Sequence, residues 1–385
     1  MRESISYTAN AGSGTPAPEL LAPWRPSKRA DIRRFHASLP GYRPTPLVHL
    51  DALADAWGLG KLWLKDEGHR MGLSAFKVLG ASFAVAQLMK EQLGLPGVST
   101  LNDIRAALAR NGERPTLVTA TDGNHGRAVA WTARQLGCPA VVYMPRGSVE
   151  ARVEAIRGEE AVVEVLDQLY DGCVDQAEHD ANVHGWWLVQ DTARPGYEAV
   201  PRWIMQGYVT LLDEVFEQLE EARPTHVLLQ CGVGSFAGAM AAGLVTSMPE
   251  KPPWIGLVQP ARADSAAQSF AVGRPQPAAG GLDTIMAGMA CAELSPLAWP
   301  ILQALCAGVF ACPDEVTREG MRLAAEQGVV CGETGAVTLG LLQRLCNERA
   351  LARRRGLTGL DGSARVLLVS TEGATDPVGY REIVG

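Results

Sequence analysis

Lysine is scarce in this 385-residue sequence, so a lysine in an apolar segment is easy to find. Of the six lysines, Lys77 lies between Phe76 and Val78 at the start of a strongly apolar stretch. Such a side chain either extends its ammonium group to the surface or is buried, and burial lowers the pKa of an amine. An uncharged amine is a nucleophile that can form a Schiff base with an aldehyde. The residues alone leave both interpretations open.

A polar loop, Thr121 to Gly126, lies between a predicted strand and a predicted helix. Backbone amides at the start of a helix bind anions such as a carboxylate group, and Asp122 and Asn124 add an acid and an amide. The structural alternative is an N-cap formed by Thr121 or Asp122. The two interpretations are compatible, and His125 is expected to have a structural role.

A second loop, Gly232-Val233-Gly234-Ser235, also joins a predicted strand to a predicted helix. Its next glycine, Gly238, comes one residue later than a dinucleotide fingerprint requires. The following strand ends in Gln259, where a ribose-binding site would have an acid. The loop therefore predicts a phosphate site of the mononucleotide kind.

Polar side chains follow two more predicted strands. Ser370 and Thr371 end one of them, and a hydroxyl group there can bond a neutral pyridine nitrogen or can simply belong to a turn. Asp191 follows another strand and is either a turn residue or a general base. Pyridoxal 5′-phosphate requires three such groups together. They are an amine that reacts with its aldehyde, a loop that binds its phosphate and a hydroxyl that bonds its ring nitrogen.

The elements that position these residues alternate between strand and helix, which predicts an α/β fold with parallel βαβ units. We expect two α/β lobes with parallel twisted sheets and the cofactor in the cleft between them. The expected large domain comprises residues 1–77, with an N-terminal arm at 1–45, and residues 192–385; the small domain is 78–191. The predicted strands are 61–66, 116–120, 140–144, 161–166, 186–190, 227–230, 255–258 and 366–370; the predicted helices are 76–93, 127–136, 149–157, 170–183, 198–222, 236–247, 314–327 and 335–354.

Composition excludes several classes of protein. Hydrophobic residues make up 47% and charged residues 20%, which is typical of a globular chain. The net charge of −7 argues against a nucleic-acid surface. The longest uncharged run, Val227 to Pro249, contains four glycines and is better explained by a buried strand, loop and helix than by a membrane span. Eight scattered cysteines without zinc-ligand spacing favour a cytoplasmic protein without a metal centre.

The motifs together resemble the fold-type II pyridoxal-phosphate enzymes, the tryptophan synthase β-like group, over about residues 42–377. Within that group the sequence most resembles the diaminopropionate ammonia-lyases. The segments that carry the resemblance are Tyr42 to Leu47, Ala75 to Gly80, Thr121 to Gly126, Val189 to Thr192, Cys231 to Ser235, Gly281 to Thr284 and Ser370 to Gly373. Asp122, the Gly281 segment and the Ser370 segment point to the lyases in particular. Phe236, Gln259 and Ala374 depart from the family pattern and affect the expected substrate contacts more than cofactor binding.

The resemblance implies roles for particular residues. Lys77 would bind the cofactor covalently and take a proton from Cα, while Asp191 would be a second base for the other enantiomer. Asp122 would assist the leaving amine. The remaining implied contacts are Phe76 against the ring, Asn124 on its phenolic oxygen, Gly232, Val233, Gly234 and Ser235 on its phosphate, Ser370 or Thr371 on its nitrogen, and Thr121, Asp122, Gly123 and Asn124 on the substrate.

The reaction implied is elimination of ammonia from D- and L-2,3-diaminopropionate, with pyruvate and a second ammonia as products. The alternatives are a threonine or serine dehydratase or another β-eliminating lyase, a nucleotide-binding oxidoreductase, and a non-catalytic cofactor-binding protein. The expected partner is a small amino acid rather than nucleic acid or membrane, and the family is commonly homodimeric.

Overall fold

The computed structural model describes residues 4–385 except 13, 15 and 96–99. The chain divides into two compact units, one formed by residues 1–26, 44–69 and 211–385, and the other by residues 27–43 and 70–210. The expected domain boundaries, after residues 77 and 191, differ from these bounds, and the expected division stays a prediction. Helix α9 (Ala199–Leu219) contains the boundary between the two units at residue 210.

The larger unit is built on a seven-stranded sheet with the order β1-β10-β9-β8-β11-β3-β2. Its five central strands are parallel, and β1 and β2 are antiparallel edge strands. The strands are β1 (Ser6–Ala9), β2 (Leu47–His49), β3 (Lys61–Asp66), β8 (His226–Gln230), β9 (Trp254–Pro260), β10 (Gly308–Cys312) and β11 (Arg365–Ser370). The expected arm at 1–45 thus contains β1, which extends the sheet of its own chain.

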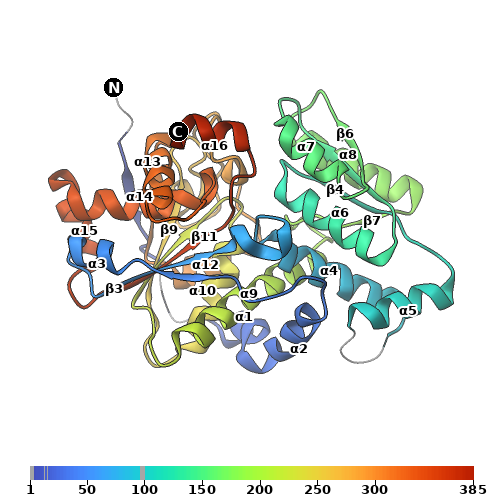
Figure 1. The fold of residues 1–385 in the computed structure, drawn as a ribbon, viewed down its shortest axis with the longest axis horizontal. Helices are drawn as coiled ribbons and strands as arrows, with labels where there is room; N and C mark the ends of the chain where they lie inside the picture. The colour runs from blue at the N-terminus through green and yellow to red at the C-terminus, as the bar shows by residue number, and fades with distance from the viewer. Residues whose placement is uncertain (1–3, 13, 15, 96–99) are drawn as a thin grey trace. The chain divides into compact units, whose positions relative to one another are not determined.

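Helices cover both faces of this sheet, as parallel strands require. Figure 1 shows α13 and α14 side by side against it. The helices of this unit, besides part of α9, are α1 (Pro18–Leu21), α3 (Asp51–Trp57), α10 (Ser235–Ser247), α11 (Ser265–Val272), α12 (Trp299–Leu305), α13 (Asp314–Glu326), α14 (Glu333–Asn347), α15 (Ala352–Thr358) and α16 (Pro377–Val384). The helix expected over 335–354 ends at Asn347, and a separate helix, α15, follows it.

The smaller unit contains a parallel four-stranded sheet with the order β6-β5-β4-β7. Its strands are β4 (Leu117–Ala120), β5 (Ala140–Met144), β6 (Val162–Val165) and β7 (Trp187–Leu188); its helices, besides part of α9, are α2 (Pro26–Ala37), α4 (Lys77–Gln92), α5 (Leu101–Asn111), α6 (Asn124–Leu136), α7 (Glu150–Arg157) and α8 (Tyr170–His184). The predicted strands and helices of residues 116–183 correspond to these elements within a few residues. The predicted α/β fold with parallel sheets is confirmed.

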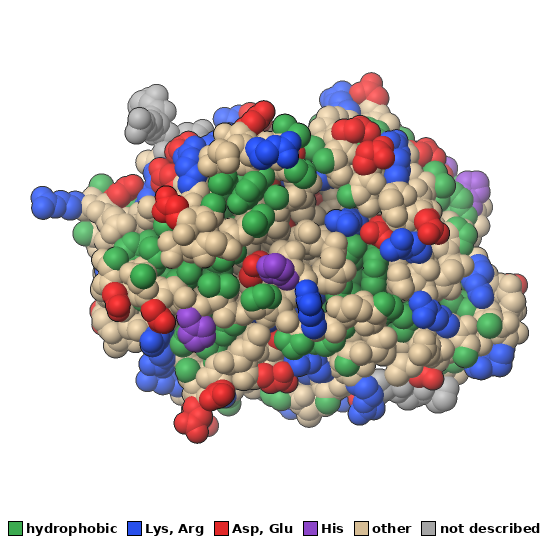
Figure 2. Space-filling model, in the orientation of Figure 1, with side chains coloured by type: hydrophobic (Ala, Val, Ile, Leu, Met, Phe, Trp, Pro, Cys, Tyr) green, Lys and Arg blue, Asp and Glu red, His purple; other side chains and the backbone are tan. Residues whose placement is uncertain are grey.

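Within the described residues, no helix has both the length and the hydropathy needed to cross a membrane. Over the same residues, no group of three or more His, Cys, Asp and Glu side chains is arranged to hold a metal ion. Acidic and basic side chains are interspersed on the face shown in Figure 2.

Candidate functional site

Lys77 is the first residue of α4, and its position is set by close packing between α4 and α9. A Cβ atom at Gly80 would lie 2.4 Å from Cε1 of Tyr208, and one at Gly207 would lie 2.4 Å from the Leu79 carbonyl oxygen. Only glycine permits this approach of the two backbones. The Phe76 ring packs edge-on against Tyr208, with 4.7 Å between centroids, and the Lys77 ammonium lies 5.7 Å from the Phe76 centroid. The lysine is therefore held among aromatic rings.

Lys77 forms a short ion pair with Asp191, 2.6 Å from Nζ to Oδ2, and 22% of the lysine side chain is exposed. Burial opposes the charged amine, but the Asp191 carboxylate outweighs it and holds the pKa of Lys77 above its ordinary value. Burial likewise raises the pKa of Asp191, but the Lys77 ammonium lowers it to about 2. Burial acts on the pKa of Lys77 in the expected direction, but the net shift is upward because an opposite charge is in direct contact.

Lys65 shows by contrast what a structural buried lysine looks like. Its side chain is fully buried on β3, where Nζ lies 2.8 Å from Oε2 of Glu214 and donates to the Thr45 carbonyl oxygen (2.8 Å) and to Oε1 of Gln218 (2.9 Å). No surface of the amine is left for a ligand, whereas Lys77 is partly open. The predicted strand at 61–66 is β3, which lies between β11 and β2 and is buried from Leu62 to Asp66.

Asp191 is positioned through the residue before it. The Gln190 side chain accepts hydrogen bonds from Oγ1 of Thr119 (3.0 Å) and from the Ala120 amide (3.1 Å), and it donates to the Tyr170 hydroxyl (2.8 Å). These bonds tie the segment after β7 to the end of β4. The loop that follows β4 therefore lies next to Asp191. Gln190 belongs to the segment Val189 to Thr192 that carries the resemblance, but no role was predicted for it, because a glutamine at a strand end has no distinguishing pattern.

The loop after β4 leaves the start of α6 without a side-chain cap. Gly123 is the N-cap residue, and Oγ1 of Thr121 accepts a hydrogen bond from its amide (2.9 Å). The structural alternative, capping of the helix by the side chain of Thr121 or Asp122, is therefore not observed. The start of a helix without a side-chain cap is a common place for an anion to bind. Burial raises the pKa of Asp122, opposed by the charges of Arg152 and Lys77.

His125, the second residue of α6, is buried beside Asp191. Its Nε2 forms a 2.8 Å hydrogen bond with the Val189 carbonyl oxygen, which fixes Nε2 as the donor. Its Nδ1 lies 3.9 Å from Oδ2 of Asp191, and burial lowers the pKa of the imidazole. His125 thus links α6 to the segment that carries Asp191, in agreement with the structural role expected from the sequence.

In the larger unit, the loop after β8 is packed closely against neighbouring residues at its two glycines. A Cβ atom at Gly232 would lie 3.1 Å from Sγ of Cys291 and from the Gly288 carbonyl oxygen. Gly234 has φ of +90° and is the N-cap of α10, with no side-chain cap. The amides at the start of a thirteen-residue helix therefore lie behind a loop that only glycine can form. This is the arrangement expected for a phosphate group.

The two hydroxyl groups at the end of β11 differ in their contacts. The Ser370 hydroxyl donates to Sγ of Cys331 (2.9 Å) and lies 3.3 Å from the Glu372 carbonyl oxygen. Oγ1 of Thr371 is buried and makes no hydrogen bond within the described structure, although a buried hydroxyl group without a partner is costly. The Ser370 hydroxyl thus has partners within the protein, whereas the Thr371 hydroxyl has none among the described residues.

Gln259, which replaces the acid of a ribose-binding site, is hydrogen-bonded within the protein. It is fully buried, and its Oε1 accepts a hydrogen bond from the Ala266 amide (3.1 Å) in the first turn of α11. It therefore caps a helix through Oε1 and supplies no carboxylate for a ribose. This contact agrees with the sequence argument against a dinucleotide.

Comparisons with known proteins agree with these features. Residues 38–371 match the model of the family described as "Pyridoxal-phosphate dependent enzyme", and the chain belongs to this family. Its cofactor is pyridoxal 5′-phosphate. The diaminopropionate ammonia-lyase of Escherichia coli K12 is 44% identical over 361 residues, which cover 91% of this chain and 90% of that protein.

Two solved structures extend the likeness to the fold. A crystal structure of the E. coli diaminopropionate ammonia-lyase in complex with D-serine has a TM-score of 0.93 at 41% identity, covering 99% of this chain and 97% of that chain. Another, in complex with an aminoacrylate-PLP azomethine reaction intermediate, has a TM-score of 0.91 at 40% identity with the same coverage. The resemblance recognised from the sequence motifs is confirmed.

The close packing around Gly234 gives a testable prediction. A Cβ atom there would lie 2.7 Å from Cδ1 of Leu302, and the positive φ adds strain. We expect Gly234→Ala to lower the free energy of unfolding of the cofactor-free protein by about 1–3 kcal/mol and to weaken cofactor binding. Urea unfolding and cofactor titration measure the two effects.

Gly273 provides the matched control, because it has φ of +72° and a Cβ atom added there would meet no other atom within 4 Å. Gly273→Ala should affect stability through the backbone alone and leave cofactor binding unchanged. Equal cofactor affinity in both variants would contradict the role given to the loop after β8.

Proposed function

We propose that this chain catalyses the elimination of ammonia from D- and L-2,3-diaminopropionate, yielding pyruvate and a second ammonia. The observation that supports it best is the pair of Lys77 and Asp191 in contact at 2.6 Å, with Asp122 interacting electrostatically with both. One amine and two carboxylates supply the proton acceptors and the acid that the reaction needs. The likeness to the E. coli enzyme supports the choice of substrate.

The residues present fit the cofactor. The loop Gly232 to Ser235 would bind its phosphate through backbone amides at the start of α10. Thr371 would bond the ring nitrogen, because its buried hydroxyl is unsatisfied. Lys77 would bind the aldehyde, with Phe76 against the ring and Asn124 on the phenolic oxygen. When bound, pyridoxal phosphate withdraws electrons from Cα of an amino acid and so makes the Cα proton acidic.

The protein's own groups then move protons at two positions. Lys77, in its neutral form, takes the Cα proton of one enantiomer, and Asp191 takes that of the other. The ion pair keeps these two groups together, so that removing either charge changes the pKa of its partner. Asp122 delivers a proton to the leaving nitrogen, since burial raises its pKa and favours the protonated acid. The uncapped start of α6 binds the substrate carboxylate through the loop from Thr121 to Asn124.

The atoms of the overall reaction balance. The bond from Cβ to the amino nitrogen breaks, and the electron pair left at Cα forms the double bond of an enamine. Water then replaces the remaining amino group. One diaminopropionate and one water therefore give one pyruvate and two ammonia, with no oxidant or reductant.

The experiment that tests the proposal is a product assay of the loaded enzyme with D- and L-diaminopropionate, D- and L-serine and L-threonine. Diaminopropionate should give two ammonia per pyruvate, and serine one. We expect kcat/KM for both diaminopropionate enantiomers to exceed that for serine by at least about 100-fold. A higher kcat/KM for L-threonine or L-serine would instead identify a dehydratase.

The choice between the two hydroxyl groups at the end of β11 gives a second prediction. We expect Thr371→Val to shift the absorbance of the bound cofactor and to weaken its binding about tenfold, because the valine leaves the ring nitrogen without a donor. Ser370→Ala removes a bond to Cys331 and should leave the absorbance unchanged. The reverse result, with only Ser370→Ala altering the spectrum, would assign the contact to Ser370.

We further propose that the protein is a homodimer located in the cytoplasm. The proposal is based on the likeness to a family that is commonly dimeric, and on cysteines that are all free in the described structure. Light scattering coupled to size-exclusion chromatography measures the mass, and a value near twice 41.0 kDa is expected.

A further inference from the structure

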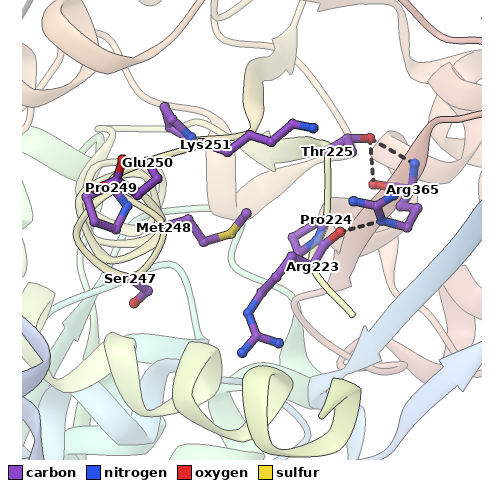
Figure 3. A pocket seen from close by; sticks show the side chains of 10 residues that line it. Arg223, Pro224, Thr225, Ser247, Met248, Pro249, Glu250, Lys251 and Arg365 are labelled. Carbon is purple, nitrogen blue, oxygen red and sulfur yellow. Dashed lines mark hydrogen bonds between the residues drawn. The ribbon is translucent and has the colours of Figure 1, made fainter. Parts of the chain in front are cut away.

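A cavity of about 380 Å³ lies in the larger unit, away from the segments assigned to the cofactor. Figure 3 shows it between the end of α10 and the segments that precede β8 and β11. Its lining residues are Arg223, Pro224, Thr225, Ser247, Met248, Pro249, Glu250, Lys251, Pro252 and Arg365. A volume of this size is within the range of small-molecule sites.

The cavity lies at the amino ends of three neighbouring parallel strands. Thr225 immediately precedes β8, Arg365 is the first residue of β11, and Pro252 lies two residues before β9. The glycine loop and Thr371 follow the carboxyl ends of β8 and β11. A five-residue strand is about 16 Å long, so this cavity is separate from those groups.

The lining carries more positive than negative charge. Arg223, Lys251 and Arg365 contribute three cations, and Glu250 is the one acid among the ten lining residues. This excess is the opposite of the whole chain, whose net charge is −7. Within the described residues, none of the three cations forms an ion pair with a carboxylate. Their charge is therefore not neutralised by the protein.

Both arginines are fixed through neutral backbone groups. Nε of Arg365 donates to the Arg223 carbonyl oxygen (2.6 Å), and the Arg365 amide donates to Oγ1 of Thr225 (2.8 Å). Nη1 of Arg223 donates to the Ala222 carbonyl oxygen (2.7 Å), and its guanidinium lies 5.1 Å from the Phe216 ring centroid. Guanidinium groups held in this way lose little conformational freedom when an anion binds.

The other lining side chains complete the chemistry of the site. Lys251 extends across the cavity toward Thr225, and the Met248 side chain points from the end of α10 toward Pro224 (Figure 3). Three prolines form much of the remaining wall. A ligand that matches this lining has a strongly anionic end and a small body with apolar surface.

We propose that this cavity binds a small organic dianion, a phosphate monoester or a dicarboxylate, at Lys251 and Arg365. This site is independent of the proposed reaction, because none of its residues belongs to the segments that would hold the cofactor or substrate. A bound dianion would bridge the starts of β8, β9 and β11 and so stabilise the sheet of the larger unit.

The test is calorimetric titration of the cofactor-loaded full-length protein at low ionic strength. Loading the cofactor keeps the loop after β8 from binding the probes. The probes are glycerol 3-phosphate and succinate, with sodium chloride of equal ionic strength as the blank. We expect saturable binding of one molecule per chain for at least one probe, weakened by added salt. The probe that binds distinguishes a phosphate ester from a dicarboxylate.

Variants test whether the probe binds at Lys251 and Arg365. We expect Lys251→Gln to weaken binding at least about tenfold and Lys251→Arg to retain it. Lys28→Gln, the same change at an exposed lysine of the smaller unit, should have no effect. Turnover without probe should be equal in all three variants. Arg365→Lys, which keeps the charge but not the geometry, should reduce affinity without unfolding the protein.

Two results would overturn the proposal. One is the absence of saturable binding by either probe. The other is equal affinity in the wild type, Lys251→Gln and Arg365→Lys, which would mean that the anion binds elsewhere. Because the site shares no residue with the lyase machinery, either result leaves the proposed reaction unaffected.

Discussion

Lys77→Ala is expected to abolish turnover of both diaminopropionate enantiomers, with a loss of at least about 10⁴-fold in kcat. The substitution removes the amine that would bind the cofactor and one of the two bases. It also leaves Asp191 buried without its 2.6 Å partner, so the pKa of Asp191 should rise above the present value of about 2. Steady-state assays and the absorbance of the purified protein measure the effect.

The matched control is Lys61→Ala, which removes an exposed lysine paired with Asp51 at 3.2 Å. Exposed ion pairs contribute little, so stability and turnover should stay close to the wild type. A yellow and active Lys77→Ala protein would disprove the assignment of the amine. Partial recovery of turnover in Lys77→Ala with added methylamine would support it, because a free amine then replaces the missing base.

Asp191→Asn is expected to reduce turnover of the two enantiomers to different extents. Turnover of the D-isomer should fall about 10²- to 10⁴-fold, as is typical when a general base is removed, and turnover of the L-isomer should fall much less. A second effect follows from the ion pair. Without the carboxylate, the charges of Tyr208 and Asp122 remain, but the strongest opposition to burial is lost. The pKa of Lys77 should therefore fall, and the cofactor should bind the cofactor-free protein faster at neutral pH.

These two effects separate a catalytic role of Asp191 from a structural one. Asp175→Asn, at an exposed carboxylate paired with Arg194 at 2.8 Å, is the control and should leave both enantiomers unaffected. Equal losses on both enantiomers would refute the assignment of two bases. An unchanged pH dependence of cofactor binding would show that Asp191 does not set the pKa of Lys77.

The fold was largely predictable because hydrophobic periodicity and glycine turns are local signals. The strand at 140–144 and the helix from 170 were located within a residue, since apolar runs bounded by turns define them. The short edge strands β1 and β2 were not predicted. Their pairing with β10 and β3 depends on residues far away in the chain, about which a local pattern gives no information.

The sequence indicated which residues belong to the site, but it did not indicate which of them are in contact. A lysine in an apolar segment and an acid after a strand are visible in the sequence, but their 2.6 Å contact joins positions 114 residues apart. The sign of the Lys77 pKa shift depends on that contact, and burial alone therefore gave the wrong direction. The contacts of Tyr208 and Gln190 were missed for a related reason, because a tyrosine in an amphipathic helix and a glutamine at a strand end are common.

The fully buried ion pair of Lys65 and Glu214 restricts which substitutions these two positions tolerate. Losing one member leaves an uncompensated charge in the interior, at a cost of about 3–5 kcal/mol, which is a large part of the stability of a typical domain. Replacing both members by apolar residues of similar volume has a much smaller cost. The two positions should therefore covary among descendants of this gene, so that lineages retain both charges or neither.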